Sequence, residues 1–173
     1  MIISKSCFVY NNSMKNNTTK QNTIEIINKL KEKNETITFA ESCTGGRIAA
    51  AFTAISGASS VLNGSCVTYS NEIKSQWLGV NEQTLINHGA VSSECVKEML
   101  TGITEMANAD HSIAVSGIAG PTGGTDEKPV GTVYLGVNIK GNICVEHHLF
   151  SGDREAVQEQ ATETAIALFK NNL

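Results

Sequence analysis

Residues 40–46, with the sequence AESCTGG, place the hydroxyl of Ser42 beside the thiol of Cys43 on a turn that contains two glycines. β-Branched and aromatic residues precede this segment and an alanine-rich stretch follows it, so we expect a strand before the turn and a helix after it. Such a turn directs free backbone N–H groups and the positive end of a helix dipole toward a ligand, which suits an oxyanion or a phosphate. The same pattern also fits an ordinary strand-to-helix connection, in which glycine supplies only backbone freedom.

A serine nucleophile needs a base, and Lys74 is the main candidate. It follows a predicted strand, 64–69, by about one turn of helix, where the positive end of the helix dipole favours the neutral amine. A lysine base needs a pKa that has fallen from about 10.4 to roughly 7 or 8. Ile73 and Trp77 favour the desolvation that would lower this pKa, whereas a nearby Glu72 would oppose it. A solvated helix lysine fits the local sequence as well. The four histidines, His88, His111, His147 and His148, lie in contexts typical of structural or surface residues.

A second segment suited to anion binding is the loop 116–124, which has four glycines in nine residues and follows an apolar strand. Backbone N–H groups in such a loop can hold a phosphate or a carboxylate. The loop matches neither GxGxxG nor GxxxxGK[ST], so the sequence does not indicate a dinucleotide or ATP site, and a structural connection is an equal alternative. Arg154, at the start of the last predicted helix, is either a bidentate cation for an anionic ligand or a solvated first-turn residue.

Strands and helices alternate along the chain. The predicted strands are 35–40, 64–69, 113–115, 131–139 and 143–150, the last two joined by a hairpin at 140–142. The predicted helices are 22–34, 47–55, one that carries Lys74, 81–87, one from 92 or 93 to 107, and one from 151 or 153 onward. This order predicts an α/β fold, a three-layer α/β/α sandwich with a mixed, mostly parallel sheet.

Composition limits the class of protein. A chain of 173 residues fits one globular domain that buries about 70% of its unfolded surface. The net charge of −4 and the dispersed basic residues argue against a nucleic-acid surface. Five cysteines without a CxxC pair argue against a disulfide framework and a zinc site, and favour a reducing cytoplasm. No apolar run approaches the roughly 20 residues of a membrane span, so we expect no membrane partner.

The N-terminal segment differs from the rest of the chain. Residues 11–22 are rich in Asn, Thr and Lys, and such a polar tract buries too little apolar area to offset the entropy of ordering it. We therefore expect residues 1–22 to be a disordered polar extension and residues 23–173 to form the domain. Met14 offers a second start of translation, which would make residues 1–13 dispensable.

Five motifs, in this order, resemble the CinA C-terminal domain family, the nicotinamide-nucleotide amidases or nicotinamide mononucleotide deamidases. They are AESCTGG, VTYSN followed by Lys74, SGIAGP at 116–121, KPVGTV at 128–133 and SGDR at 151–154, and the similarity runs from about residue 24 to the C-terminus. The resemblance implies an α/β/α domain that hydrolyses the carboxamide of nicotinamide mononucleotide to nicotinate mononucleotide and ammonia in pyridine nucleotide salvage. Many relatives carry an additional N-terminal pyrophosphatase-like domain. We expect this chain to be a stand-alone form of the C-terminal domain, without that addition.

The resemblance also implies a serine/lysine amidohydrolase without metal or cofactor. Ser42 is then the nucleophile, Lys74 its base and Tyr69 a hydroxyl that helps to organise the pair. Residues expected to bind substrate, either through N–H groups around the nucleophile or through the phosphate, are Thr44, Gly45, Gly46, Ser116, Gly117 and Arg154, with Arg47 and Lys128 as alternative phosphate cations. The expected partners are a small nucleotide substrate and copies of the same chain, in a homo-oligomer that is a dimer or higher.

Two alternatives remain at this point. Cys43 would replace Ser42 as the nucleophile if the helix N-terminus stabilised its thiolate. A nucleotide-binding domain that keeps the pocket without turnover is the non-enzymatic alternative.

Overall fold

A five-stranded mixed sheet organises residues 6–173, the part of the chain that this computed structural model describes, with side chains described from residue 18 onward. The strands are β1 (Ile37–Glu41), β2 (Leu62–Val67), β3 (His111–Gly117), β4 (Thr132–Ile139) and β5 (Asn142–Leu149), in the order β2-β1-β3-β4-β5. β1 pairs in parallel with β2 and with β3, and β4 is antiparallel to both β3 and β5. All the strands except β4 therefore point the same way.

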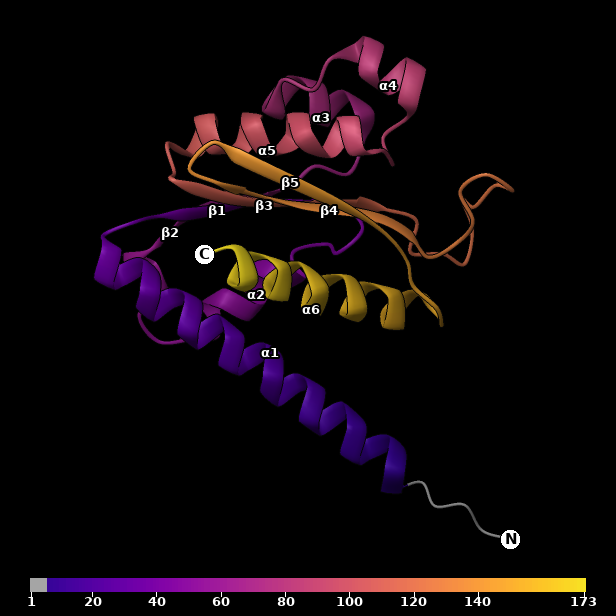
Figure 1. The fold of residues 1–173 in the computed structure, drawn as a ribbon. Coiled ribbons are helices and arrows are strands. Elements are labelled where there is room, and N and C mark those ends of the chain that lie inside the picture. Colours follow the sequence, from indigo (N-terminus) through magenta and orange to yellow (C-terminus); the bar gives the residue numbers. More distant parts are fainter. Residues whose placement is uncertain (1–5) are drawn as a thin grey trace, which may run out of the picture.

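Helices cover both faces of the sheet. On one face lies α5 (Ser93–Ala107), with α3 (Asn71–Leu78) and α4 (Glu82–His88) beyond it (Figure 1). On the other face lie α2 (Arg47–Thr53) and α6 (Arg154–Asn172), with α1 (Ser6–Lys33) outside them and a short 3-10 turn, η1 (Ala58–Ser60), before β2. The predicted three-layer α/β/α sandwich with a mixed sheet is confirmed. None of the helices in residues 6–173 combines the length and the apolar composition needed to cross a membrane.

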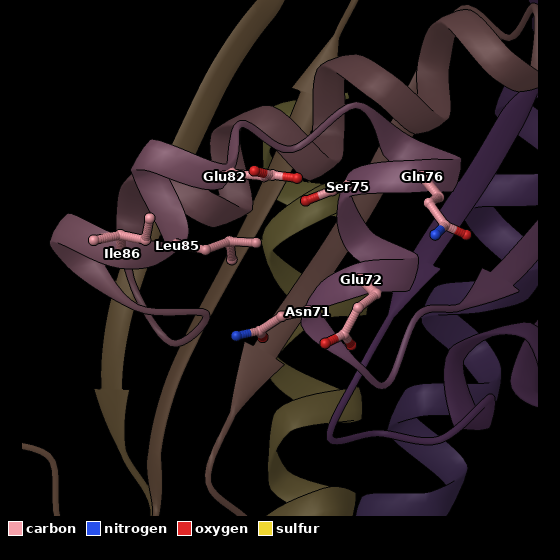
Figure 2. Close-up of a pocket in the computed structure, with 7 residues that line it drawn as sticks. All are labelled: Asn71, Glu72, Ser75, Gln76, Glu82, Leu85 and Ile86. Carbon is pink, nitrogen blue, oxygen red and sulfur yellow. The ribbon is translucent and has the colours of Figure 1, made fainter.

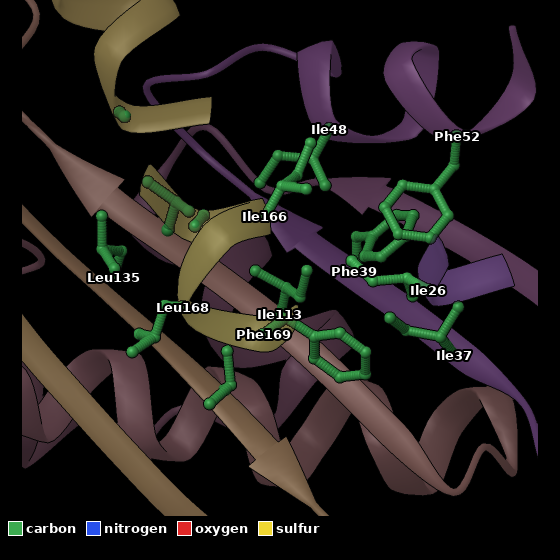
Figure 3. Close-up of a cluster of buried hydrophobic side chains, with 14 of the residues drawn as sticks. Ile26, Ile37, Phe39, Ile48, Phe52, Ile113, Leu135, Ile166, Leu168 and Phe169 are labelled. Carbon is green, nitrogen blue, oxygen red and sulfur yellow. The ribbon is translucent and has the colours of Figure 1, made fainter. Parts of the chain in front are cut away.

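Most of the core lies between the sheet and the α2/α6 layer. Every residue of β1 is buried, as expected for a central strand covered on both faces. The rings of Phe39 and Phe52 lie 4.7 Å apart in this layer, close to Ile113 and Phe169 (Figure 3). Each fully buried side chain of this size contributes about 1.5–3 kcal/mol relative to its exposed state. The central strand that leads to Ser42 is therefore held rigidly from both sides.

The N-terminal helix is longer than predicted. It begins at Ser6 rather than at Asn22, so the helix continues through residues that the sequence predicts to be disordered. Lys170 of α6 holds the predicted part of this helix: its ammonium donates to the Asn22 amide oxygen at 2.9 Å and pairs with Glu25 at 2.7 Å. The division of the chain at residue 22 stays a prediction. The proposed start at Met14 lies among residues whose side chains are not described, and residues 1–5 lie outside the described residues.

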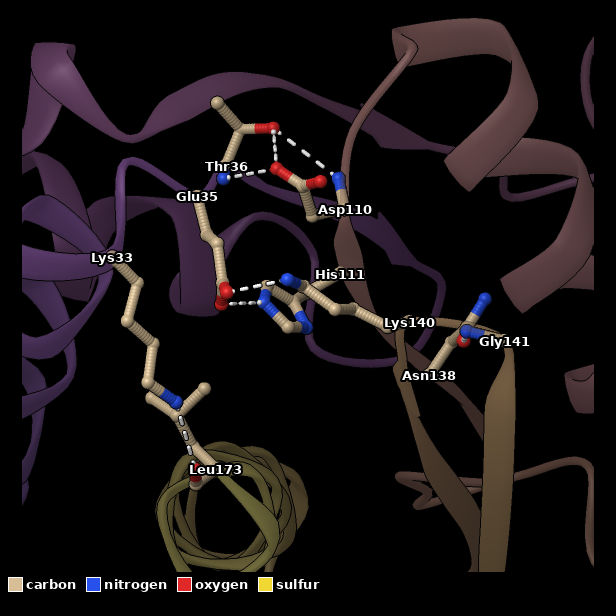
Figure 4. A network of polar contacts seen from close by, with 9 residues as sticks. All are labelled: Lys33, Glu35, Thr36, Asp110, His111, Asn138, Lys140, Gly141 and Leu173. Carbon is tan, nitrogen blue, oxygen red and sulfur yellow. Dashed lines mark hydrogen bonds and ion pairs between the residues drawn. The ribbon is translucent and has the colours of Figure 1, made fainter.

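The amino ends of β1 and β3 are joined by a polar network (Figure 4). The Glu35 carboxylate lies 2.7 Å from Nε2 of the buried His111 and pairs with Lys140, and the latter contact lowers the pKa of Glu35. The Asp110 carboxylate accepts hydrogen bonds from the backbone N–H of Thr36 at 2.8 Å and from the Thr36 hydroxyl at 3.1 Å. This network closes the edge of the sheet opposite to the nucleophile turn, and it gives His111 a structural environment, as predicted.

Gly102 sets how closely α5 approaches α3, the helix that carries Lys74. A Cβ at this position would lie 1.8 Å from the Leu78 carbonyl oxygen, and backbone atoms of a packed helix cannot move away at low cost. We therefore expect Gly102→Ala to lower the free energy of unfolding by about 1–3 kcal/mol, although alanine favours a helix more than glycine does. Urea unfolding measures the change. Gly64→Ala is the matched control, because a Cβ there meets nothing within 4 Å. Equal stability of Gly102→Ala and the wild type would contradict this packing argument.

Candidate active site

The carboxyl ends of the three parallel strands meet at one edge of the sheet. The chain leaves β1 for β2 on one side and later enters β3 on the other side of β1. Ligands of open α/β sheets bind at such a change of direction, outside the carboxyl ends of the strands. Ser42 follows β1, Thr68 and Tyr69 follow β2, and Ser116 lies at the end of β3. The topology thus brings together motifs that are far apart in the sequence.

The turn after β1 is organised by Glu41, whose carboxylate is completely buried. It accepts hydrogen bonds from the N–H groups of Gly46, Ile48 and Ala49 at 2.9–3.1 Å, which cap the first turn of α2. The N–H of Gly45 donates to the Ser42 carbonyl at 3.1 Å. The glycines are needed here because both adopt positive φ, 64° at Gly45 and 98° at Gly46.

This arrangement differs from the predicted roles of the turn. The N–H groups of Gly45 and Gly46 are used inside the protein, and the Glu41 carboxylate occupies the positive end of α2 that we expected to face a ligand. Within the described part of the chain, the N–H groups of Ser42, Cys43 and Thr44 make no hydrogen bond to another residue. Thr44 is fully buried, so an oxyanion site built on this turn has the N–H groups of Ser42 and Cys43 as its backbone donors.

Lys74 lies in the first turns of α3, which begins after Ser70; the Ser70 hydroxyl accepts from the Ile73 N–H and caps the helix. The Lys74 Nζ lies 3.2 Å from Ser42 Oγ and donates to the Thr68 carbonyl at 2.7 Å. Only 1% of the Lys74 side chain is exposed, and no carboxylate in residues 18–173 pairs with it. Burial without a counter-charge lowers the pKa of Lys74. The predicted nucleophile and base are thus in contact.

Burial has the opposite consequence for the neighbouring thiol. Cys43 is 4% exposed, and desolvation raises its pKa to about 12, with the nearby Lys74 and Arg154 only partly offsetting it. Cys95, the other buried thiol near Lys74, has a pKa raised to about 11 for the same reason. A thiol with such a pKa is almost entirely protonated near neutral pH, and the thiolate is the reactive form. The structure therefore favours Ser42 over Cys43 as the nucleophile.

Ser42 and Lys74 open onto a cavity of about 320 Å³, a size typical of small-molecule sites. Tyr69, Ser116, Gly117 and Arg154 line it as well, so six of the predicted site residues meet in one place. The predicted binding residues Thr44, Gly45 and Gly46 are not among its lining residues, because the turn packs them behind Ser42 and Cys43. Arg154 brings a permanent positive charge to the cavity, and no Asp or Glu is among its described lining residues, so its charge suits an anionic ligand.

Arg154 is the first residue of α6, after the N-cap Asp153. Its guanidinium donates to the Tyr69 hydroxyl at 2.7 Å and to the Gly120 carbonyl at 2.8 Å, so it connects the end of β2 to the glycine-rich loop. The Tyr69 hydroxyl thus contacts Arg154, whereas the resemblance implied that it organises Ser42 and Lys74. The alternative phosphate cations do not line the cavity: Arg47 donates to the Thr44 carbonyl at 3.4 Å, and Lys128 to the carbonyls of His88 and Val91.

Comparisons with known proteins show the family and the fold of this chain. The family model described as the CinA C-terminal domain matches residues 18–173. The chain belongs to the CinA C-terminal domain family. It is 49% identical over 138 residues to the nicotinamide-nucleotide amidohydrolase PncC of Escherichia coli K12, covering 79% of this chain and 84% of PncC. It is also 49% identical over 144 residues to a CinA-like protein of Endomicrobium trichonymphae, but it spans only 34% of that longer protein.

Solved structures of the CinA superfamily show the same fold. The competence damage-inducible protein A of Klebsiella pneumoniae superposes with a TM-score of 0.85 at 41% identity, covering 88% of this chain and 95% of that one. A CinA superfamily protein of Escherichia coli superposes with a TM-score of 0.87 at 36% identity, covering 90% of both chains.

Two polar residues of this CinA domain were not identified as site residues from the sequence. Glu41 was included in the nucleophile motif without a role, and Gln158 of α6 donates from Nε2 to the Cys43 carbonyl at 2.6 Å. The only sequence signal for Glu41 is an acidic residue at the end of an otherwise apolar strand. Gln158 lies one helical turn after Arg154, and nothing in its local sequence indicates the contact with the nucleophile turn.

A second cavity of similar size, about 330 Å³, lies between α3 and α4 (Figure 2). Its lining residues are Asn71, Glu72, Ser75, Gln76, Glu82, Leu85 and Ile86. Neither Lys74 nor any other amine lines it, so it lacks the nucleophile and base that the first cavity contains. Groups of three or more His, Cys, Asp or Glu side chains suited to a metal ion do not occur among the described residues.

The lowered pKa of Lys74 predicts a specific pH dependence of stability. Between the folded pKa and the unfolded value of about 10.5, the unfolded chain binds more protons, so the burial of Lys74 costs most at lower pH and nothing above 10.5. Replacement by Met removes this cost. The free energy of unfolding of Lys74→Met minus that of wild type should therefore be largest near pH 7. This difference should decrease as pH rises toward 10.5. Urea unfolding across this range measures the difference.

The control for this series is Lys97→Met, which replaces an exposed lysine of α5 by the same residue. Its stability difference from wild type should change little over the same range. If Lys74→Met and Lys97→Met show the same pH dependence, then Lys74 is not a buried, destabilised amine.

Proposed function

We propose that this chain hydrolyses the carboxamide of nicotinamide mononucleotide to nicotinate mononucleotide and ammonia. The observation that carries the proposal is the buried Lys74 amine, 3.2 Å from the Ser42 hydroxyl at the wall of a cationic cavity. A relative whose name states this activity, PncC, is 49% identical and matches the chain over 84% of its own length. Because the fold, the family and the paired side chains agree, amide hydrolysis is better supported than nucleotide binding alone.

The first half of the reaction transfers the acyl group to the protein. Neutral Lys74 accepts the Ser42 proton while the serine oxygen attacks the carboxamide carbon, and the C=O electrons move onto oxygen. The N–H groups of Ser42 and Cys43, two residues that line the cavity, stabilise the resulting oxyanion. When the tetrahedral intermediate collapses, the C–N bond breaks, and the lysine ammonium returns its proton to the departing nitrogen. The products of this half are ammonia and an ester of Ser42.

Water completes the cycle. Lys74, neutral again after protonating the leaving group, accepts a proton from a water molecule that attacks the ester carbon. Collapse of the second tetrahedral intermediate releases nicotinate mononucleotide and returns the proton to Ser42. The hydrogen bond from Nζ to the Thr68 carbonyl keeps the amine in place through both halves, because it fixes one N–H direction and leaves the side facing Ser42 free.

Arg154 is the group that we expect to bind the phosphate of the substrate. Among the described residues that line the cavity, Arg154 carries a permanent positive charge, whereas Lys74 acts as a neutral base. The Tyr69 hydroxyl and the Gly120 carbonyl hold the guanidinium in a defined orientation, so little side-chain entropy is lost when an anion binds. The loop that begins with Gly117 adds backbone N–H groups on the same side.

The proposal extends to the pathway, the location and the oligomeric state of the enzyme. The products place the reaction in pyridine nucleotide salvage, and the family resemblance and free cysteines favour a cytoplasmic enzyme that works without a cofactor. A homo-oligomer, a dimer or higher, is proposed on the same family resemblance.

Removal of either member of the pair should abolish turnover. We expect Ser42→Ala and Lys74→Met to lower the rate of ammonia release from nicotinamide mononucleotide by at least about 1,000-fold, since each removes a step that the other cannot replace. Cys43→Ala should retain activity within about tenfold, because its protonated thiol takes no part. Loss of activity in Cys43→Ala with an active Ser42→Ala would instead identify a thiol enzyme. Wild-type protein that binds the nucleotide without releasing ammonia would favour the non-enzymatic alternative.

The pH profile tests the protonation state of the base. Only neutral Lys74 accepts the serine proton, so kcat/KM for the mononucleotide should rise with pH through a pKa below 10.5 and then level off. A rate that falls over this range as pH rises would show that the reaction needs a protonated group instead.

The phosphate assignment predicts a selective loss. We expect Arg154→Gln to raise KM for nicotinamide mononucleotide by about 10- to 100-fold, as for loss of a hydrogen bond to a charged group, with little change for the riboside, which has no phosphate. Steady-state ammonia release with both substrates measures this selectivity. Arg47→Gln and Lys128→Gln are the matched controls, because both remove cations outside the cavity. A selective effect in either control, and none in Arg154→Gln, would reassign the phosphate site.

A further inference from the structure

The connection between α4 and α5, residues 89–92, is held by side chains from elsewhere in the chain. Two of its residues, Ala90 and Val91, line the cavity that contains Ser42. In the described part of the chain, neither makes a hydrogen bond to another backbone group. The Ala90 carbonyl instead accepts from the Ser116 hydroxyl at 2.8 Å, and the Val91 carbonyl accepts from the Lys128 ammonium at 2.8 Å. The position of this part of the cavity wall therefore depends on two distant side chains.

Lys128 holds the connection at both of its ends. Besides its contact with Val91, its Nζ donates at 2.7 Å to the carbonyl of His88, the last residue of α4. None of the ion pairs among residues 18–173 involves Lys128, so its ammonium is committed to these two carbonyls. A charged donor makes a stronger hydrogen bond than a neutral one. One ammonium thus fixes the chain on either side of Ala90.

Lys128 belongs to the loop that supplies another part of the same cavity wall. This loop, residues 118–131, joins β3 to β4, and its first two residues, Ile118 and Ala119, line the cavity. The N–H of Ile118 donates to the Thr132 carbonyl and its carbonyl accepts from the Gly131 N–H, both at 2.8 Å. The base of the loop is therefore fastened by backbone hydrogen bonds, and Lys128 connects the loop to the segment that has none.

These two segments give the cavity its apolar part. Its aliphatic lining residues, among those described, are Ala90, Val91, Ile118 and Ala119. The proposed substrate places its carboxamide at Ser42 and its phosphate at Arg154, and its ribose carries hydroxyl groups. The pyridine ring, which is bonded directly to the carboxamide carbon, is the part with apolar faces. Since apolar side chains commonly line small-molecule sites, the ring is the part of the substrate that matches these four residues.

We propose that Lys128 is a positioning residue for the aromatic ring of the substrate: by binding the carbonyls of His88 and Val91, it keeps the apolar wall of the cavity in place. This inference rests on the proposed amide hydrolysis at Ser42. Lys128 does not line the cavity, so it acts through the connection that it holds and not on the substrate directly. Its loss therefore weakens every ligand that carries the ring and leaves ligands without the ring unaffected.

The test is Lys128→Met, which has a similar length and no donor. We expect KM for nicotinamide mononucleotide and for its riboside to rise by the same factor, about tenfold, with little change in kcat, because binding is lost equally in the ground state and the transition state. The inhibition constant of ribose 5-phosphate, which has the phosphate and no ring, should be unchanged. Lys128→Arg, which keeps a charged donor, should restore most of the affinity. Lys128→Gln, shorter and uncharged, replaces Lys128→Met if the latter does not fold.

The matched control is Lys33→Met, because Lys33 also donates to a main-chain oxygen, that of Leu173 at 3.2 Å, and lies away from the cavity (Figure 4). It should change none of these constants. An unchanged KM in Lys128→Met, or equal losses for ligands with and without the ring, would overturn the proposal and leave Lys128 with a structural role. A loss for the mononucleotide and not for the riboside would also overturn it, and would make Lys128 a phosphate cation.

A second measurement separates this inference from the substrate assignment. Benzenesulfonyl fluoride and methanesulfonyl fluoride both sulfonylate serine: the oxygen displaces fluoride from sulfur and loses its proton, but only the first reagent carries a ring on the reacting atom. The ratio of their rates at Ser42 should be about tenfold lower in Lys128→Met than in wild type and Lys33→Met. A lowered ratio in a protein that releases no ammonia from the mononucleotide would reject the substrate and keep the inference. Equal ratios would reject the inference, whatever the substrate.

Discussion

The site depends on keeping a primary amine out of water with no carboxylate beside it. Within residues 18–173, Lys74 has the Ser42 hydroxyl and the Thr68 carbonyl as its polar partners, and neither carries a charge that would stabilise an ammonium. The apolar layer around α5, with Gly102 allowing α3 to approach closely, makes this burial possible. Stability and chemistry are opposed at this position, because the burial that lowers the pKa of the amine, and so favours its neutral form, also destabilises the folded chain.

The nucleophile turn leaves only some of its backbone N–H groups available to a ligand. Helix N-termini attract anions, and a nucleotide phosphate bound at α2 would lie in the wrong place for attack on the carboxamide. The Glu41 carboxylate occupies that helix end, while Arg154 offers a cation across the cavity. In the proposed reaction, the phosphate of the nucleotide is thereby directed to the α6 side, and the carboxamide is left facing Ser42.

Sequence patterns predicted what depends on local order and missed what depends on packing. The alternation of strands and helices gave the mixed sheet and its layers, and the motifs identified the contact between Ser42 and Lys74. Thr44, Gly45 and Gly46 were expected to face the ligand, because a glycine-rich turn has the same sequence whether its N–H groups are free or bound. In the structure, the Glu41 side chain folds back and accepts hydrogen bonds at the start of α2. Gln158 was missed since its partner lies 115 positions away. The extent of α1 was underestimated because the polar composition of residues 11–22 was taken to indicate disorder.

The functional residues come from the end of β1, from α3, from the end of β3 and from α6, the last helix of the chain. Before α6 packs on the sheet, the turn lacks its hydrogen bond from Gln158 and the cavity lacks Arg154. Before α3 packs under α5, Lys74 is an ordinary hydrated ammonium, and Ser42 is an alcohol no more reactive than any other. If the proposed mechanism holds, the reactivity of Ser42 is therefore a property of the complete fold and not of any one segment of the chain.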